Sequence, residues 1–282
     1  MSADLTREFH FTAQDFRLIS QLIYQRAGIA LAESKQELVY SRVARRLRAT
    51  GIRTFAEYLD YLQRGNESEW EEFTNSLTTN LTSFFREAHH FQILAGHLRK
   101  LGKTRPIEIW CSACSTGEEA YSLAMTAVDA FADFDNPVRI VASDLDTRVL
   151  EIARAGRYSL ESVARIPVQQ IDKFFVRGKD EHAGYVQVRP ELQKMIIFRQ
   201  VNLLDRVWPI REKLDVIFCR NVMIYFDKAT QLAILKKFAP LMRGDGLLFA
   251  GHSENFFHAD AYFRLRGQTV YELSEKLKSA QR

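Results

Sequence analysis

Residues 108–119 read EIWCSACSTGEE, and the fold class follows from them. The mostly apolar segment from Ile107, one residue before this stretch, to Cys111 has the length of a short buried strand. Small residues continue to Gly117, where they allow a tight turn and a close approach of the backbone to a ligand. A helix is then expected from Gly117 to about Phe134. A strand that turns directly into a helix in this way is typical of an α/β domain that binds a ligand at this turn.

The same alternation of strand and helix continues along the chain and predicts a mostly parallel sheet covered on both faces. Further strands are expected at 138–142, 214–219 and 247–250, and further helices at 147–155 and 228–242. The last pair, 263–266 and 269–273 around Gly267-Gln268, predicts an antiparallel hairpin at the edge of the sheet.

One stretch departs from the alternation. Between Gly156 and Met195, the apolar runs 174–176 and 185–188 flank a turn at 178–184. This pattern predicts a small antiparallel β insert at about 157–200.

The first part of the chain has only the helical hydrophobic period. Four helices are expected: one opened by a capping box at Thr12 and stopped by Gly28, one at 34–49, one opened by a capping box at Thr54, and one at 68–77. We therefore expect a helical domain at 1–78 and an α/β domain at 79–282.

Composition sets the class of protein. The chain has 282 residues, 46% hydrophobic and 26% charged, as in globular proteins. No apolar run reaches the roughly 18 residues of a membrane span, and residues 1–8 lack the apolar core of a secretory signal. Three cysteines favour a reducing compartment, so a cytoplasmic location is expected. The net charge of +4 favours an acidic partner only weakly.

Two features at the ends of the first two strands indicate a nucleoside ligand. The turn after Cys111 lacks the G-x-G-x-x-G spacing of dinucleotide loops, and a plain strand-to-helix turn is the alternative. Asp144 ends the second strand, where a carboxylate can accept from both hydroxyls of a ribose. The alternative for Asp144 is the N-cap of the next helix, a role for which Asp146 competes.

Cys111 and Cys114 form a C-x-x-C pair without a second pair. A zinc site needs four ligands, so no metal is expected. A redox role is the alternative to small residues that fill a tight turn.

Four stretches carry a family resemblance: TTNLTSFFRE (78–87), STGEE (115–119), FCRNVMIYF (218–226) and LFAGHSEN (248–255). With them the chain resembles the CheR-type chemotaxis receptor methyltransferases over nearly its whole length. The resemblance implies a class I, Rossmann-like methyltransferase domain with an N-terminal helical domain and a small antiparallel β insert. It implies transfer of a methyl group from S-adenosylmethionine to glutamate carboxylates on the cytoplasmic helices of chemotaxis receptors.

The resemblance also implies roles for individual residues. Arg86 and Tyr225 match residues held to lie beside the transferred methyl group. The cofactor contacts map onto Asn80, Thr82, Arg86, Glu119, Asp144, Asn202, Leu203, Arg220 and Asn221. The β insert matches a subdomain that, in some members, docks a peptide at the receptor C-terminus.

The chemistry of a glutamate side chain is consistent with methyl transfer by the residues that this chain offers. A glutamate carboxylate is ionised near neutral pH, since its reference pKa is about 4.3. It needs positioning and loss of water more than a general base. Arg86 can pair with a carboxylate or position the cofactor, and the Tyr225 hydroxyl can orient the attacking oxygen. The alternatives are a surface salt bridge for Arg86 and a core aromatic for Tyr225.

A basic stripe on the second helix indicates an acidic partner. At about 100° per residue, Arg42, Arg45 and Arg46 lie on one side of the helix and border its apolar face, with Lys35 beside them and Leu38 within the stripe. We expect these arginines to bind the receptor, and an ordinary solvated face is the alternative.

Two other functions remain open on the sequence. A nucleic-acid methyltransferase would use the stripe against phosphates. Such enzymes that modify exocyclic amines usually carry an Asn/Asp-Pro-Pro loop, whereas the corresponding residues here are RNVMI (220–224). A signalling module that binds the cofactor without turnover is the second alternative, against which Arg86 and Tyr225 both speak. We expect neither nucleic-acid binding nor membrane insertion.

Overall fold

A computed structural model describes residues 7–280 and divides the chain into two compact units. The first comprises the residues up to Thr79 together with Tyr225–Asp227, and the second comprises Asn80–Ile224 and the residues from Lys228 onward. Among the described residues, no helix is both long and apolar enough to span a membrane.

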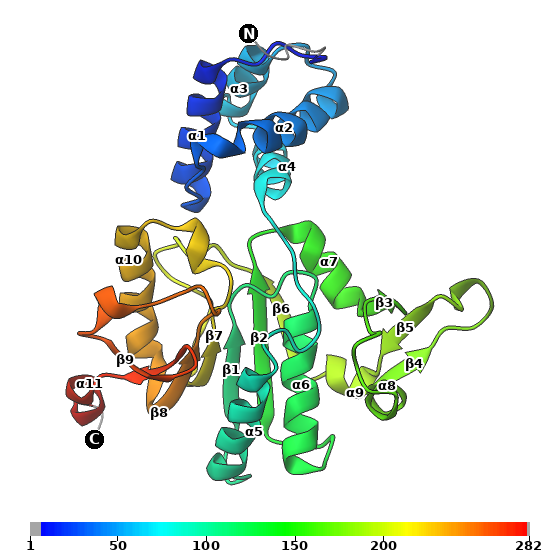
Figure 1. Cartoon of the computed structure of the whole chain (residues 1–282), viewed down its shortest axis with the longest axis vertical. Helices are drawn as coiled ribbons and strands as arrows, with labels where there is room; N and C mark the ends of the chain where they lie inside the picture. Colours follow the sequence, from blue (N-terminus) through cyan, green and yellow to red (C-terminus); the bar gives the residue numbers. More distant parts are fainter. Residues whose placement is uncertain (1–6, 281–282) are drawn as a thin grey trace. The chain divides into compact units, whose positions relative to one another are not determined.

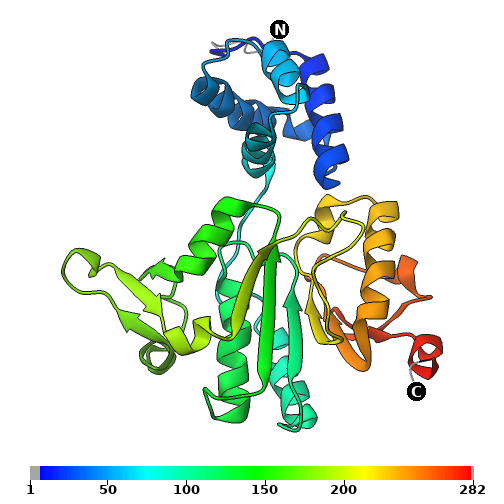
Figure 2. The ribbon, with the colours of Figure 1, turned by 180° about the vertical axis from the view of Figure 1, so that it is seen from behind.

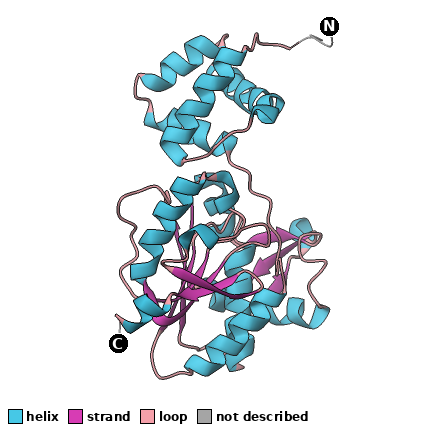
Figure 3. Cartoon of the chain, turned by 60° about the vertical axis from the view of Figure 1, so that its left-hand side comes forward, coloured by secondary structure: helices cyan, strands magenta, loops and turns pink. Residues whose placement is uncertain are grey.

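The first unit is built from helices (Figure 3). Its helices are α1 (Ala13–Ala27), α2 (Gln36–Thr50), α3 (Phe55–Gln63) and α4 (Glu67–Leu77). The predicted capping box at Thr12 is confirmed, and Gly28 ends α1 with the left-handed φ of 71° that favours glycine. At Thr54 the hydroxyl accepts from the Glu57 amide as predicted. A full capping box would also have the Glu57 carboxylate accept from the Thr54 amide. The structure instead records that this carboxylate accepts from the Thr54 hydroxyl.

The second unit is a seven-stranded sheet with helices on both faces, as the predicted fold class requires (Figure 1). The strand order is β6-β2-β1-β7-β8-β10-β9. The pairs among the first five strands are parallel, and β10 pairs antiparallel with β8 and β9. The strands are β1 (Ile107–Cys111), β2 (Val138–Asp144), β6 (Ile196–Gln200), β7 (Leu214–Phe218), β8 (Met242–Phe249), β9 (Phe263–Gly267) and β10 (Val270–Leu273).

Strand β1 shows how the two faces are covered. Ile107, Ile109 and Cys111 belong to the core cluster that includes α5 (His89–Leu101) and α6 (Glu118–Phe131). Trp110 points to the opposite face, where its ring packs against Trp208 and against Phe238 of α10 (Lys228–Phe238). Figure 2 shows this second face of the sheet, with α10 beside it. Side chains of a strand alternate between faces, so one apolar strand serves both layers.

Helix α5 and strand β6 are two of the elements of the sheet domain that were not expected from the sequence. Helix α5 lies in a stretch for which no element was predicted, and it packs on α6. Strand β6 lies within 157–200, the stretch assigned to the insert, but it pairs in parallel with β2 in the main sheet. The sequence has a short apolar run here, Met195 to Phe198, but it directly follows the antiparallel pattern and falls within the predicted insert. In the structure only the first residue of β6 is buried.

The antiparallel insert is present as a separate three-stranded sheet of order β3-β5-β4. Its strands are β3 (Arg157–Ser159), β4 (Phe175–Arg177) and β5 (Tyr185–Val188). Helix α7 (Thr147–Ala155) precedes it, and α8 (Val168–Phe174) and α9 (Pro190–Gln193) lie within the same stretch. The short helix α11 (Glu275–Ser279) follows β10. Because β5 is the last strand of the three-stranded sheet in the sequence, the antiparallel part of the insert ends at Val188.

Candidate functional site

The predicted site residues of the second unit gather at the carboxyl ends of the parallel strands. After β1 the chain continues outward to β2 and β6, and then returns to form β7 and β8 on the other side of β1. The order of the strands therefore reverses between β1 and β7, and ligands of such sheets bind beside this point. Strands β1, β2, β6 and β7 each end directly before one of the predicted site segments or within it.

Asp144, at the end of β2, organises the turn after β1. Its carboxylate accepts from the Ser115 amide at 2.8 Å and from the Asp146 amide at 3.1 Å. Asp146 makes the N-cap of α7, as it accepts from the amides of Arg148 and Val149. Asp144 is thus not the helix cap. Burial raises the pKa of Asp144 to about 6, because an ionised carboxylate loses solvation there.

Asn80 joins the same corner of the site. Its side-chain amide donates to the Asp146 carboxylate at 2.8 Å, and its carbonyl accepts from the Ser115 hydroxyl at 2.9 Å. Two predicted residues, Asn80 and Asp144, therefore meet through Ser115 and Asp146. The two partners of Ser115, the Asn80 carbonyl and the Asp144 carboxylate, are 35 and 29 positions away from it in the sequence.

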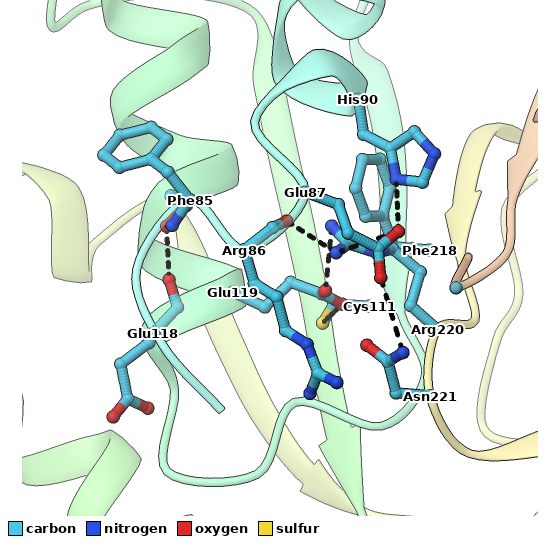
Figure 4. Close-up of polar contacts among 12 residues, drawn as sticks. Phe85, Arg86, Glu87, His90, Cys111, Glu118, Glu119, Phe218, Arg220 and Asn221 are labelled. Carbon is cyan, nitrogen blue, oxygen red and sulfur yellow. Dashed lines mark hydrogen bonds and ion pairs between the residues drawn. The ribbon is translucent and has the colours of Figure 1, made fainter. Parts of the chain in front are cut away.

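Arg220 is the centre of a buried charge cluster (Figure 4). Its side chain is fully buried, and its guanidinium donates to the Arg86 carbonyl at 2.5 Å. The guanidinium also lies 3.4 Å from the Glu119 carboxylate and 3.6 Å from that of Glu87. Asn221 donates to Glu87 at 3.4 Å. The structure therefore brings together Arg86, Glu119, Arg220 and Asn221, four of the predicted residues.

Neighbouring positive charges counteract the effect of burial on the pKa values of the acidic groups in this cluster. Burial alone would raise the pKa of Glu87, but Arg220, His252 and His90 together hold it below its ordinary value. Burial raises the pKa of Glu119, against the opposing effect of Arg220. The Nε and Nη1 atoms of Arg220 are buried without a hydrogen-bond partner among the described residues. Such atoms leave donors for a ligand carboxylate, and the acidic groups beside them suit a ligand cation.

Glu87 is a residue of this site that the sequence analysis left without a role. It stands in the motif 78–87, has a φ of 58°, and accepts from Asn221 and from the exposed His252. With His89 and His90 it forms a group whose ligand atoms lie within 4.8 Å of one another, as metal ligands do. The Arg220 guanidinium lies beside the same carboxylate and already supplies a positive charge.

Asn202, Leu203 and Thr82 complete the predicted cofactor contacts. Asn202 and Leu203 follow β6, and the preceding Val201 donates its amide to the Asp144 carbonyl at 3.0 Å. Leu203 is buried, and the Asn202 side chain accepts from the Leu204 amide at 3.0 Å. Strand β6 therefore brings this segment to Asp144. Thr82 is half-buried in the segment between Asn80 and Arg86.

The three cysteines, Cys111, Cys114 and Cys219, are free and fully buried at this edge of the sheet. Burial raises the pKa of each thiol well above its ordinary range. Cys111 donates to the Glu119 carboxylate at 3.3 Å. A buried, protonated thiol is a poor nucleophile, so these side chains act as small packing residues of the site.

The remaining predicted residues, Arg42, Arg45, Arg46 and Tyr225, belong to the first unit, and the three arginines have different surroundings. Arg42 donates to the carbonyls of Leu77 and Thr78 at the end of α4, at 2.9 and 2.6 Å. Arg46 is mostly buried and pairs with two carboxylates, Glu69 and Glu72, each at 2.8 Å.

Arg45 is the arginine of the stripe that remains exposed. Its guanidinium contacts the Ser41 carbonyl at 3.4 Å, and it has no ion pair among residues 7–280. The helical period placed all three arginines on one side of α2, but it carried no information on the partners that α4 supplies. The Tyr225 carbonyl accepts from the Ala30 amide at 2.9 Å, and its side chain is half-buried.

Comparisons with known proteins agree with this arrangement. The family described as CheR methyltransferase, SAM binding domain, matches residues 80–272, and the CheR methyltransferase all-alpha domain matches residues 14–78. Chemotaxis protein methyltransferase 2 of Pseudomonas aeruginosa is 52% identical over 266 residues, which cover 94% of this chain and 95% of that one. The chemotaxis protein methyltransferase of Escherichia coli is 50% identical over 272 residues, covering 96% and 94%. That of Salmonella typhimurium is 51% identical over 272 residues, covering 96% and 94%.

Proposed function

The chain belongs to the CheR methyltransferase family, and from this premise we propose that it transfers methyl groups to glutamate side chains of bacterial chemotaxis receptors. The products are glutamate methyl esters, and the cofactor is S-adenosylmethionine. The resemblance carried by the four motifs is thereby confirmed. The observation that supports this function most is identity near 50% to chemotaxis methyltransferases over almost the whole of both chains.

The residues at the carboxyl edge of the sheet fit this cofactor. Its amino-acid part carries a carboxylate that suits the Arg220 guanidinium, whose buried Nε and Nη1 atoms have no hydrogen-bond partner among the described residues. The Glu119 carboxylate suits a cationic group, and Asp144 offers acceptors for a ribose. When bound, S-adenosylmethionine supplies a methyl group on a positively charged sulfur. We assign Asn80, Thr82, Asn202, Leu203 and Asn221 to the same binding site.

The chain's own contribution to the reaction is positioning. A receptor glutamate is already ionised at neutral pH and needs no base. We propose that the Arg86 guanidinium, held by the Leu81 carbonyl at 2.9 Å, guides the carboxylate or the cofactor. The Tyr225 hydroxyl orients the attacking oxygen, and its ring keeps water out. Both effects act mainly in the transition state and should therefore appear in kcat.

Two further proposals concern the partners. The protein acts in the cytoplasm, where the receptor helices carry the glutamates. The β insert binds a peptide at the receptor C-terminus by adding it as a strand. What supports this is the edge position of β4 and the exposed apolar side chains Val176 and Tyr185, which are 49% and 45% exposed. An exposed sheet edge offers unpaired backbone groups to an extended peptide.

The experiment that tests the proposed function is incubation with methyl-labelled cofactor and a cytoplasmic receptor fragment, followed by release of base-labile methyl groups. Tyr225→Phe should lower kcat at least about tenfold, since loss of near-attack geometry can cost on the order of 10²-fold. Affinity for S-adenosylhomocysteine should stay within about twofold of the wild type. Tyr262→Phe, beside β9, is the matched control and should change neither quantity.

Absence of base-labile label with the wild-type protein would contradict the proposed function. A normal rate for Tyr225→Phe would leave the function standing and remove the hydroxyl from it. A loss of thermal stability in step with the loss of rate would assign Tyr225 to the core instead.

A further inference from the structure

Glu254 has a buried carboxylate whose side-chain hydrogen bonds within residues 7–280 all come from backbone amides. It is 5% exposed and stands in the turn after β8, within the motif 248–255. Its Oε1 atom accepts from the amides of Val222 and Met223 at 3.0 and 2.8 Å. Its Oε2 atom accepts from the Asn221 amide at 3.0 Å and from the Gly251 amide. No ion pair recorded within residues 7–280 includes Glu254.

These four backbone amides form an anion-binding site, and the anion in it is a side chain of the same protein. Burial raises the pKa of Glu254, and the four amides oppose that effect by stabilising the ionised form. Successive amides that converge on one anion require an unusual backbone conformation. Asn221 has this conformation, with a φ of 56° in the left-handed region that most residues avoid.

The loop held by Glu254 carries residues of the proposed site. Asn221 donates to Glu87 on one side, and Arg220, the residue before it, forms the buried charge cluster. A Cβ atom on Gly251 would lie 2.4 Å from the Asn221 side-chain nitrogen, so the turn after β8 fits closely against this loop. Two residues beyond Met223 in the sequence stands Tyr225.

We propose that Glu254 is a positioning residue of the methyltransferase: its carboxylate fixes the loop 221–223 and thereby the Arg220-Asn221 pair. It acts through the loop and touches neither cofactor nor substrate. The inference rests on the proposed function for its rate prediction. Its predictions for loop order and for product affinity need no receptor.

Glu254→Gln tests the carboxylate with almost no change in shape. A glutamine amide has one oxygen and one NH2 group, and each carboxylate oxygen of Glu254 accepts from two amides. Whichever way the amide is turned, its NH2 group faces two backbone donors. The loop must therefore shift, and donors lose their partners.

We expect Glu254→Gln to bind S-adenosylhomocysteine at least about tenfold more weakly and to slow single-turnover methylation by on the order of 10²-fold. Amide hydrogen exchange at 221–223 should accelerate, while exchange in β1 and β2 stays unchanged. Glu254→Asp keeps the charge on a shorter side chain and should give smaller changes in the same direction. Glu272→Gln is the control, since Glu272 lies on β10 and pairs with Arg264 of β9 and Lys278 of α11. It should leave product affinity and rate within about twofold of the wild type.

All measurements are made at a temperature at which each variant is fully folded. Wild-type affinity, rate and exchange in Glu254→Gln would overturn the inference. If Glu254→Gln does not fold, Glu254→Asp decides: unchanged product affinity and exchange at 221–223 would overturn it equally. A wild-type protein that fails to methylate receptor fragments would refute the proposed function, and the product affinity and exchange of the variants would still decide the role of Glu254.

Discussion

Asp144 shows how one side chain serves both the structure and the proposed cofactor site. It holds the amides of Ser115 and Asp146, and it is expected to accept from the ribose. Replacement by alanine would therefore do more than remove ribose contacts, since two amides would lose their acceptor. Asparagine keeps the shape and one acceptor oxygen, and is the sharper test.

The pKa of Asp144 leads to a prediction for pH dependence. With a pKa raised to about 6, this carboxyl is ionised above pH 6 and becomes protonated as the pH falls through 6. Only the ionised form offers acceptors on both oxygens, so affinity for S-adenosylhomocysteine should be constant above about pH 7. Below pH 6 it should fall by up to tenfold per unit, equivalent to about 1.4 kcal/mol.

Calorimetric titration between pH 5 and 8 checks this dependence. Asp144→Asn should bind about tenfold more weakly at pH 7.5, since a hydrogen bond to a charged group contributes roughly 1.5–3 kcal/mol. Its affinity should lose the part of the pH dependence that Asp144 causes. Parallel pH profiles for the wild type and Asp144→Asn would exclude Asp144 as the titrating group.

At the scale of the element, α2 combines structural and exposed arginines on one helix. Arg42 holds the end of α4, and Arg46 forms a mostly buried pair with Glu69, which also accepts from the Tyr58 hydroxyl at 2.7 Å. Arg45 has no ion pair among residues 7–280, and we propose that it contacts an acidic receptor helix. Reversal of all three charges at once would confuse receptor binding with stability.

We expect Arg45→Glu to raise KM for a receptor fragment several-fold at low salt, with a smaller effect at high salt, because exposed charges are screened. Thermal stability and affinity for S-adenosylhomocysteine should not change. Arg48→Glu makes the same change of net charge on the same helix, at a side chain that is 53% exposed and lies outside the stripe, and is the matched control. The ion pair of Arg48 with Glu8 is exposed on both sides, so its loss should cost little stability. Equal methylation kinetics for Arg45→Glu and the wild type would make the stripe an ordinary solvated face.

Arg46→Glu should behave differently. It leaves Glu69 and Glu72 facing a third carboxylate, and breaking a buried ion pair typically costs about 3 kcal/mol or more. The loss should appear as a lower melting temperature of the helical unit. This contrast between neighbouring arginines separates receptor contact from folding.

On the scale of the whole molecule, we propose that different parts of the protein bind different partners. The sheet edge holds the cofactor, α2 meets the receptor helices, and the β insert binds the receptor's C-terminal peptide. Val176→Asp, at the exposed edge strand β4, should weaken binding of that peptide at least about tenfold, because a charged side chain on a sheet edge opposes addition of a strand.

Fluorescence anisotropy with a labelled C-terminal receptor peptide measures this effect. Val168→Asp is the control, since Val168 is 61% exposed on α8 of the same insert and lies on no strand. Methylation of a receptor fragment that lacks the C-terminal peptide should be the same in both variants. Equal peptide affinity in both would contradict strand addition at β4.

The sequence alone was sufficient for the class of fold and the family. Buried parallel strands such as β1 and β7 are short, mostly apolar segments, and helix caps such as Thr12 and Gly28 are local signals, so both can be found without tertiary information. Long motifs identified the family because each contains many specified positions.

Only the tertiary structure decided which polar groups are partners. Strand β6 is mostly exposed and becomes a strand of the main sheet through its pairing with β2, which no local pattern reveals. Arg45 and Arg46 have the same side chain one position apart, yet Arg46 is paired because α4 places Glu69 beside it. Glu254 finds four amides across two loops. Hydrogen bonds and ion pairs between distant segments depend on where the chain returns, and hydrophobic periodicity along the chain carries no information on that.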